Sequence, residues 1–329
     1  SHKAFEINPS DAYYAYSLAY AYELDDNIDK AIEYYSKAIE IEPSDGDYYH
    51  GLAYAYELND NNEEADEYYQ KAIQCFKEAI EDNPEDAYYY NGLASVYESI
   101  GDFETAIRYY HKTIEIDPSD AYNYFSLGYA YESLGDSDKA IDYYHKAIDI
   151  DPTEAVYFGN LSHNYELIGE PLKAIEYSTT AIGIDPNDAN FYINRGSAYN
   201  DLGQYDDAIT NFDRAIELDS NAIWAYNDRA FAFNMTGRFQ DALEDGLESI
   251  NRGNNEANPL VRIGTALAGL GRTDEALDAY SQAEAIDPTY PLLYQERALV
   301  YSGLGQADLA ASDQEMYTNL TTDQNDQSP

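Results

Sequence analysis

The sequence predicts an all-α array of antiparallel helix pairs, and three recurring features predict it. Near-identical phrases end at Pro9, Pro43, Pro84, Pro118, Pro152 and Pro186, with gaps of 34, 41, 34, 34 and 34 residues. Each period holds two apolar patterns with helical spacing, and a short turn separates them. A small residue also recurs at one point of the second pattern. A fixed period of this length is typical of repeat proteins, in which each unit packs on its neighbours.

The turn inside each period explains why the chain reverses there. Glycine suits the residue that ends a helix, because it adopts a positive φ at little cost. The turn glycines are Gly101, Gly135, Gly169, Gly203, Gly237, Gly271 and Gly305. Asp26-Asn27 and Asp60-Asn61 stand in their place in the first two periods, and such polar residues tolerate this conformation best after glycine. Each period is therefore predicted to be a helix, a turn and a second helix.

Alanine recurs at one position of the second helix. The set comprises Ala31, Ala65, Ala106, Ala140, Ala174, Ala208, Ala242, Ala276 and Ala310. A short side chain lets two helices approach to the roughly 8–10 Å of packed pairs. Each alanine is expected to face a large residue of the first helix, such as Tyr97 or Tyr131.

The period resembles the tetratricopeptide repeat. In the period that begins at Ala121, the matching positions are Tyr124, Leu127, Gly128, Tyr131, Gly135, Ala140, Tyr144, Ala147 and Pro152. The resemblance implies a right-handed superhelical solenoid of nine repeats over residues 12–320. Residues 1–11 are then expected to be the end of a truncated preceding repeat, and residues 321–329 a polar, disordered tail.

The second repeat, residues 46–86, is seven residues longer than the others. The extra stretch is a copied heptad, in which residues 68–74 are followed by the similar residues 75–81. Seven residues are almost two helical turns, so the helix is expected to grow by about 10 Å while its apolar face keeps its direction. The extension is interpreted either as a neutral insertion or as a contact point.

The charge of the chain limits the partners that it can bind. Its 63 acidic and 18 basic residues give a formal charge of −45, which repels nucleic acids and anionic lipid surfaces and attracts basic partners. A solvated acidic exterior, acid enrichment for a salty medium and cation binding remain alternative explanations. No apolar run approaches the roughly 20 residues of a membrane span, so membrane insertion is not expected. The compartment stays open, with an extracellular or cell-surface location favoured over the cytoplasm.

The resemblance implies a concave groove lined by the first helix of each pair. The aromatic and histidine candidates for it are Tyr13, Tyr16, Tyr20, Tyr54, Tyr88, Tyr122, Phe125, Tyr129, His163, Trp224 and Phe231. One glutamate per repeat accompanies them in the first five repeats: Glu23, Glu57, Glu98, Glu132 and Glu166. Large aromatic side chains bind at low entropy cost, so the groove is predicted to suit peptides. Many of the 37 tyrosines are nevertheless expected to be ordinary packing between helices.

The sequence predicts neither an enzyme nor a cofactor-binding protein. Its five histidines are scattered over different repeats, and no HExxH motif, phosphate-binding glycine loop or EF-hand spacing occurs. The single cysteine, Cys75, excludes zinc sites built from several thiolates. Weak Ca²⁺ binding by acidic turns is the one metal hypothesis, although Asp in those turns is better explained as supporting the start of the next helix. Glycosylation patterns occur at Asn160, Asn234 and Asn319, about as often as chance predicts.

Two classes of function follow, and both are scaffolds for protein–protein interaction. The specific hypothesis is head-to-tail self-assembly into a filament, because a contact that does not close on itself generates an open polymer. Its candidate surfaces are Ala15, Leu18 and Tyr22 at the start and Leu299, Leu304, Leu309 and Met316 at the end. The alternative is a monomeric adaptor that binds a basic or aromatic peptide in the acidic, tyrosine-rich groove.

Overall fold

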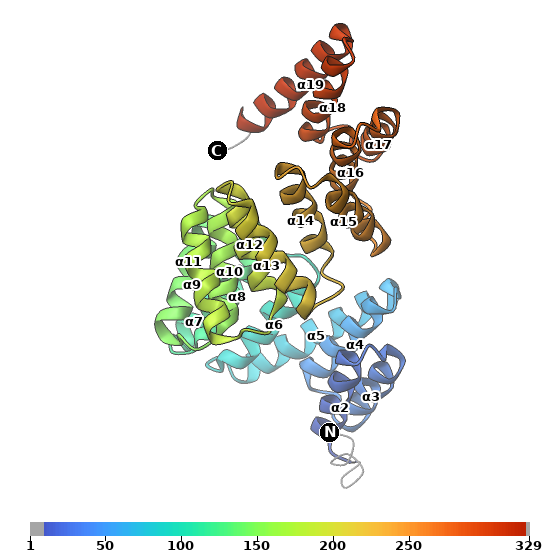
Figure 1. Ribbon diagram of the computed structural model, residues 1–329. Coiled ribbons are helices and arrows are strands. Elements are labelled where there is room, and N and C mark those ends of the chain that lie inside the picture. Colours follow the sequence, from blue (N-terminus) through green and yellow to red (C-terminus); the bar gives the residue numbers. More distant parts are fainter. Residues whose placement is uncertain (1–9, 327–329) are drawn as a thin grey trace. The chain divides into compact units, whose positions relative to one another are not determined.

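The chain is built of helices alone in the part that the structure describes. A computed structural model describes residues 10–326, and this part contains eighteen helices, α2 to α19, and no strand (Figure 1). Consecutive helices pack as nine pairs. The predicted all-α fold of helix pairs is therefore confirmed.

The chain divides into two compact units, of which the first ends at Thr153 and the second begins at Glu154. The helices of the first unit are α2 (Ala12–Leu24), α3 (Ile28–Ile41), α4 (Gly46–Leu58), α5 (Asn62–Asp82), α6 (Ala87–Ser99), α7 (Phe103–Ile116), α8 (Ala121–Ser133) and α9 (Ser137–Ile150). Those of the second are α10 (Ala155–Leu167), α11 (Pro171–Ile184), α12 (Ala189–Asp201), α13 (Tyr205–Leu218), α14 (Ile223–Met235), α15 (Phe239–Asn251), α16 (Ala257–Gly269), α17 (Thr273–Ile286), α18 (Pro291–Gly303) and α19 (Ala307–Asp326). One continuous array over residues 12–320 stays a prediction.

The turns within the pairs have the predicted backbone conformation. At Gly135, which ends α8, φ is +78°, and the next amide, that of Asp136, donates to the carbonyl of Tyr131 at 2.9 Å. Asp26 and Asp60 adopt φ values of +55° and +58° at the same place in the first two pairs. The left-handed residue lets the chain leave the helix while its last carbonyls stay hydrogen-bonded.

Aspartate side chains begin several of the first helices. The carboxylate of Asp120 accepts from the amide of Tyr122 at 3.0 Å, and Asp45 accepts from the amide of Asp47 at 2.9 Å. Asp11, Asp86 and Asp188 cap helices in the same way. Such caps satisfy amides that have no partner within the helix. The interpretation of the acidic turns as helix caps is confirmed, whereas weak Ca²⁺ binding stays a prediction.

Small residues set the distance between packed helices. Ala140 in α9 is fully buried, as are Ala31, Ala106 and Ala208 at the equivalent positions. Gly128 shows how little room there is, because a Cβ atom added there would lie 2.8 Å from the ring of Tyr144. Tyr35, Tyr110 and Tyr144 occupy one position of the second helix and are almost completely buried. The alanines are buried as predicted, but the large residue shown here is Tyr144 of the second helix and the small one is Gly128 of the first, so the pairing of each alanine with a first-helix tyrosine stays a prediction.

The ends of the described chain differ from expectation in two ways. Ala15 and Leu18 are 0% and 4% exposed, because α2 packs against α3 and α4, so the prediction that these two residues form a contact surface for self-assembly is wrong. Helix α19 continues to Asp326, so the predicted start of a disordered tail at residue 321 is too early. No Gly or Pro interrupts this helix, and the Thr321 hydroxyl donates to the carbonyl of Tyr317. The expected truncated repeat, residues 1–11, lies mostly outside the described residues.

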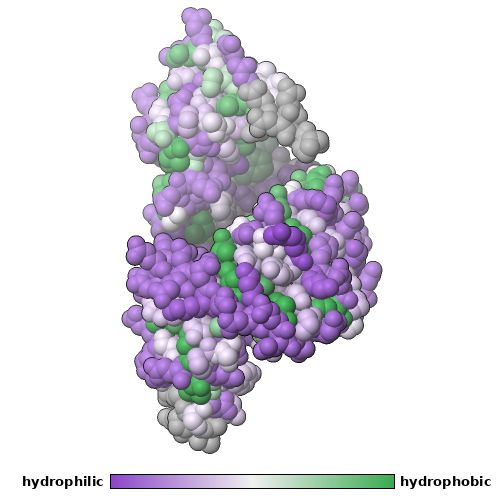
Figure 2. Space-filling model, turned by 180° about the vertical axis from the view of Figure 1, so that it is seen from behind, coloured by the Kyte–Doolittle hydropathy of each residue, from purple (hydrophilic) through white to green (hydrophobic). Residues whose placement is uncertain are grey.

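The face of the chain drawn in Figure 2 is largely hydrophilic. Figure 2 shows hydrophilic side chains over most of one face, with apolar side chains in small separate areas. Among the described residues, no helix combines the length and the hydrophobicity that a membrane crossing requires.

Candidate functional site: the faces of the first helices

A series of exposed tyrosines follows the first helices of the first unit. Tyr13, Tyr20, Tyr54, Tyr88, Tyr122 and Tyr129 are between 41% and 64% exposed. They belong to α2, α4, α6 and α8, so each repeat contributes at least one. Exposed aromatic side chains in a regular series provide contact area for a partner, because their burial is favourable and costs little entropy. We call these six residues the tyrosine row.

Two other aromatic candidates have a structural role. The ring of Tyr16 lies 5.5 Å from that of Tyr35 and 5.3 Å from that of Tyr48, and Phe125 lies 5.7 Å from Tyr144. Both are half-buried. They support the exposed row by packing on Tyr35 and Tyr144 of the second helices and, for Tyr16, also on Tyr48 of α4.

The predicted glutamates of the first unit are hydrogen-bonded to buried tyrosines. The phenol of Tyr35 donates to Glu23 at 2.9 Å, that of Tyr110 to Glu98 at 2.8 Å, and the same pairing joins Tyr69 to Glu57 at 2.5 Å and Tyr144 to Glu132 at 2.7 Å. Each bond connects the end of a first helix to the middle of the second helix of the same pair. Burial raises the pKa of Glu23 and Glu98, and the tyrosine bonds oppose this rise. These acids therefore stabilise the repeats, a role that the sequence analysis missed.

A small pocket opens between the first three repeats. It has a volume of about 260 Å³ and is lined by Tyr16, Tyr20, Glu23, Tyr35, His50, Gly51, Tyr54 and Ser99. A hydrogen bond of 2.9 Å joins Nε2 of His50 to the hydroxyl oxygen of Ser99. Burial lowers the pKa of His50 to about 4, so its imidazole is uncharged at neutral pH. We call this cavity the three-repeat pocket.

The fifth repeat lacks the tyrosine that would pair with its glutamate. Ser178 occupies that position in α11, and its hydroxyl donates to the carbonyl of Ala174 at 2.6 Å. Glu166 instead interacts with the carboxylates of Asp201 and Asp228, from the next two repeats. Burial and these two negative charges raise the pKa of Glu166 to about 8. Of the five glutamates that the sequence analysis named, Glu166 is therefore the one whose ionisation costs the most free energy in the folded chain.

Asp228 holds the repeats of this acidic group together. Its side chain accepts from the Ser197 hydroxyl at 3.3 Å and from the Asn227 amide at 2.9 Å, and its carbonyl accepts from the Asn200 side chain at 3.1 Å. The Oδ1 atom of Asn200 is buried and accepts no hydrogen bond. The sequence analysis named neither Asp201 nor Asp228, because other repeats carry different residue types at these positions.

A positively charged residue, Arg262, acts on one member of the acidic group, Asp228. Arg262 in α16 lies 4.6 Å from the ring centre of Phe231, and its charge opposes the rise in the pKa of Asp228 and Glu296 that burial causes. Arg262 is a basic residue on a first helix, and the sequence analysis did not name it among the groove residues. Among the other candidates of this unit, Trp224 is 49% exposed and His163 is half-buried.

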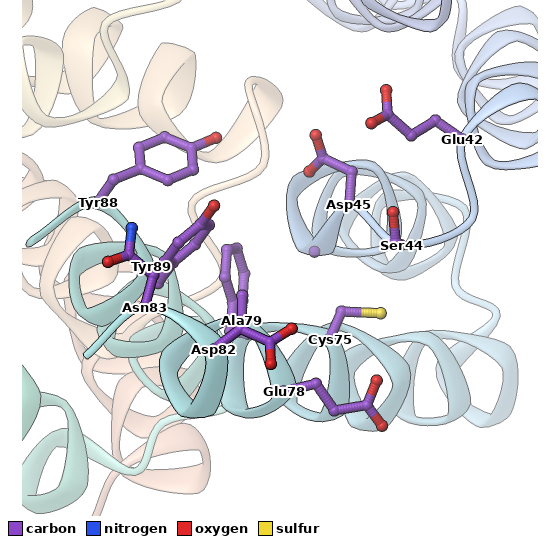
Figure 3. A pocket seen from close by; sticks show the side chains of 12 residues that line it. Glu42, Ser44, Asp45, Cys75, Glu78, Ala79, Asp82, Asn83, Tyr88 and Tyr89 are labelled. Atoms are coloured by element: carbon purple, nitrogen blue, oxygen red, sulfur yellow. The ribbon is translucent and has the colours of Figure 1, made fainter. Parts of the chain in front are cut away.

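The long helix α5 creates a second pocket in the first unit. It spans 21 residues where α3 and α7 span 14, as the copied heptad predicts. The pocket has a volume of about 360 Å³, and Figure 3 shows Ser44 and Asp45 on one side of it, the α5 residues Cys75, Glu78 and Asp82 on the other, and Tyr88 and Tyr89 beside them. Burial raises the pKa of the Cys75 thiol, which therefore stays protonated at neutral pH. Within residues 10–326, no three His, Cys, Asp or Glu side chains are arranged to hold a metal ion.

The C-terminal candidates for self-assembly are exposed. Leu299, Leu304, Leu309 and Met316 are all among the exposed large apolar residues, and Leu299 and Leu304 border a cavity of about 450 Å³. At the other end, Ala15 and Leu18 are buried, and Tyr22 is half-buried and stacks on Tyr34. The structure thus exposes one of the two predicted contact surfaces.

The three glycosylation candidates have different environments. Asn234 is 9% exposed, and its side chain donates to the carbonyl of Arg262 at 2.9 Å, so it is closed to a glycan in the folded chain. Asn160 is half-buried within α10, and Asn319 is exposed in α19. Glycosylation of these two residues stays a prediction.

The helix-pair architecture defines an α-helical repeat protein, and comparison with known families identifies the repeat. Models described as tetratricopeptide repeats match residues 12–45, 45–119, 121–154, 155–188 and 179–210, and a model described as a TPR repeat matches residues 196–237 and 264–305. The chain belongs to the tetratricopeptide repeat family. No curated protein matches the sequence.

Solved structures share the fold. A chain in the crystal structure of the APC/C hetero-tetramer Cut9–Hcn1 is 16% identical, with a TM-score of 0.61 over 94% of this chain and 73% of that chain. A tetratricopeptide repeat protein from Parabacteroides merdae is 14% identical, with a TM-score of 0.58 over 81% and 98% of the two chains. PilF of Pseudomonas aeruginosa is 20% identical, with a TM-score of 0.56 over 64% and 95%. At these identities the likeness shows the fold alone.

Proposed function

We propose that this chain is a non-catalytic scaffold that binds an extended, basic segment of a partner protein along the first helices of its repeats. The observation that carries the proposal is the tyrosine row. Six large aromatic side chains stay exposed on first helices while equally large tyrosines of the second helices are buried. A regular series of exposed rings offers successive contacts to an extended chain, and such rings are typical of binding hot spots.

The preference for a basic segment rests on charge. The whole chain has a formal charge of −45. In the second unit, burial raises the pKa of Glu166, Asp201 and Asp228, and the negative charges of Asp201 and Asp228 raise the pKa of Glu166 further. A bound cation would relieve this unfavourable concentration of negative charge. An acidic segment would be repelled by the same field.

Calorimetric titration tests the proposal. A lysine-rich peptide and an acidic peptide of equal length are titrated into the chain in 0.1 M and in 1 M NaCl, because the screening length falls from about 10 Å to about 3 Å over this range. We expect the lysine-rich peptide to bind, more weakly in high salt, and the acidic peptide not to bind. Comparable binding of both peptides contradicts the proposal.

Paired variants test the surface itself. The double change Tyr13→Ala and Tyr122→Ala removes two exposed rings and is expected to weaken binding of the lysine-rich peptide at least tenfold, since a hot-spot side chain contributes about 2 kcal/mol or more. Ile41→Ala is the control, because Ile41 is exposed on the second helix α3. Equal losses in the two proteins would show that the peptide does not bind along the tyrosine row.

Self-association is a second candidate, and the exposed leucines of α18 and α19 favour it. Leu299 and Leu309 are 64% and 49% exposed, and exposed apolar side chains near the end of a repeat array are typical of an interface. Because Ala15 and Leu18 are buried, the partner surface of a head-to-tail contact has to consist of other residues. Light scattering at high protein concentration tests it, and a monomer across a range of salt concentrations removes this candidate.

A further inference from the structure

We propose that the three-repeat pocket of the first unit binds the ammonium group of one lysine side chain of the partner. This inference rests on the proposed function and adds to it the residue type that the segment must contain. The pocket combines the aromatic rings of Tyr16, Tyr20 and Tyr54 with the carboxylate of Glu23. A cation is attracted both by the faces of aromatic rings and by a carboxylate, so this set of groups is complementary to an ammonium ion.

The shape of the pocket suits one side chain. Its volume of about 260 Å³ lies just below the roughly 300–1,000 Å³ of pockets for whole small molecules. Tyr20 and Tyr54 are 50% and 41% exposed, so their rings remain accessible at the mouth. Tyr16 packs on Tyr35 and Tyr48 and is fixed in place before a ligand arrives. Fixed rings keep the entropy cost of binding low.

The charges around the pocket leave its carboxylate available. Oε2 of Glu23 accepts from the Tyr35 phenol, which fixes the carboxylate and leaves Oε1 for a ligand. His50, the nearest basic group in the lining, is uncharged at neutral pH and does not repel a cation. No Lys or Arg is among the lining residues. The chain therefore supplies the anionic and aromatic partners of a cation without supplying the cation.

Other tyrosines of the first unit show that the chain does use its own lysines in this way. The Nζ atoms of Lys37, Lys71 and Lys146 lie 4.1, 4.3 and 4.2 Å from the ring centres of Tyr34, Tyr68 and Tyr143. These three tyrosines are on second helices, and Lys30, Lys77 and Lys139 cover Tyr22, Tyr97 and Tyr131 of first helices in the same way. Among the described residues, no such lysine covers Tyr20 or Tyr54, so these first-helix rings remain open to a cation from outside.

Glu23 favours lysine over arginine. An arginine side chain binds a carboxylate best through two parallel hydrogen bonds to its two oxygens. Oε2 of Glu23 already accepts from the Tyr35 phenol, so a two-point contact with arginine would have to share that oxygen with the phenol. An ammonium ion needs only one point of contact with the carboxylate and gains the rest of its attraction from the rings.

The test compares peptides of equal length in which the basic residue is lysine, arginine or the uncharged acetyl-lysine. Affinities are measured by calorimetry for the wild type, Tyr54→Leu, Glu23→Gln and Tyr54→Phe. We expect Tyr54→Leu and Glu23→Gln each to weaken the lysine peptide about five- to tenfold, as the loss of one cation–π or ionic contact predicts. Tyr54→Phe keeps the ring and should bind within about twofold of the wild type.

Tyr129→Leu is the matched comparison. Tyr129 occupies the position of Tyr54 two repeats later, is equally exposed at 41%, and lies outside the pocket lining. Because Tyr129 belongs to the tyrosine row, its loss should weaken the lysine and acetyl-lysine peptides to the same extent, whereas Tyr54→Leu should weaken the lysine peptide selectively, and this difference supports the pocket. A resonance shift of the His50 imidazole with the lysine peptide, and none with the acetyl-lysine peptide, supports it further.

The outcomes separate this inference from the proposed function. If the lysine peptide binds the wild type, Tyr54→Leu and Glu23→Gln with equal affinity, the lysine pocket is wrong and the scaffold proposal stands. If the arginine peptide binds more tightly than the lysine peptide and loses the same affinity in both variants, the pocket binds a guanidinium and the assignment to lysine is wrong. If no basic peptide binds the wild type, both proposals fail.

Discussion

Replacing Glu166 by glutamine should stabilise the second unit at alkaline pH. Glu166 lies near Asp201 of α12 and Asp228 of α14, while the positive charge of Arg262 of α16 acts on Asp228. Its folded-state pKa of about 8 exceeds the ordinary value of 4.5. The folded chain therefore keeps a proton that the unfolded chain loses, and the stability of the fold decreases as the pH rises from about 4.5 to about 8.

The size of the effect follows from that difference in pKa. Each pH unit between the two pKa values costs about 1.36 kcal/mol, so the full penalty is at most about 5 kcal/mol. Glu166 is half-buried, and screening by solvent and adjustment of its neighbours reduce the expected penalty to about 2 kcal/mol. Glutamine keeps the shape and removes the charge, so the variant should avoid this penalty above pH 8.

Urea unfolding at pH 5 and pH 9 measures the effect. The single tryptophan, Trp224 in α14, reports on the second unit through its fluorescence. We expect Glu166→Gln to gain about 2 kcal/mol over the wild type at pH 9 and little at pH 5. Glu217→Gln is the control, because Glu217 is an exposed glutamate of α13 in the same unit, and it should show no gain at pH 9. A difference between wild type and Glu166→Gln that is the same at both pH values refutes the reasoning.

Three further changes test the packing. Ala140→Leu should destabilise the chain by about 1–3 kcal/mol in thermal unfolding, because the larger side chain overpacks a buried position. Ala310 occupies the same repeat position but is half-buried, so Ala310→Leu should cost less. Tyr110→Phe should cost about 1.5–3 kcal/mol in urea unfolding, because Glu98 loses a hydrogen bond to a charged acceptor, and an unchanged midpoint would show that this bond contributes nothing. Leu18→Asp should reduce the helical circular dichroism of the first repeat, since Leu18 is buried, and normal helicity would contradict this.

The helix pairs could be predicted from the sequence because their determinants are local and repeated. Asp120 caps α8, Gly135 ends it and Ala140 admits the next helix, and each of these roles depends only on residues of one repeat. The recurrence of the same types every 34 residues made the prediction secure. By contrast, nothing in the spacing marks the division between Thr153 and Glu154.

The chemistry of the groove was predicted less completely, because it depends on which side chains meet. The row of glutamates was recognised, but its partners lie twelve residues later, on another helix. The recurrence of Tyr35, Tyr69, Tyr110 and Tyr144 at one repeat position was the available signal, and Ser178 was the sign that the fifth repeat differs. The grouping of Asp201 and Asp228 with Glu166 had no comparable signal, because each comes from a different repeat position.

Photo-crosslinking tests the central claim, that a basic segment binds along the first helices, most directly. A lysine-rich peptide that carries a photoreactive group at one end is irradiated with the chain, and the crosslinked residues are identified by mass spectrometry. The account predicts crosslinks on first helices, above all on α2, α4 and α6 beside the tyrosine row, which decrease in high salt. Crosslinks confined to second helices such as α3, α5 and α7 would contradict it.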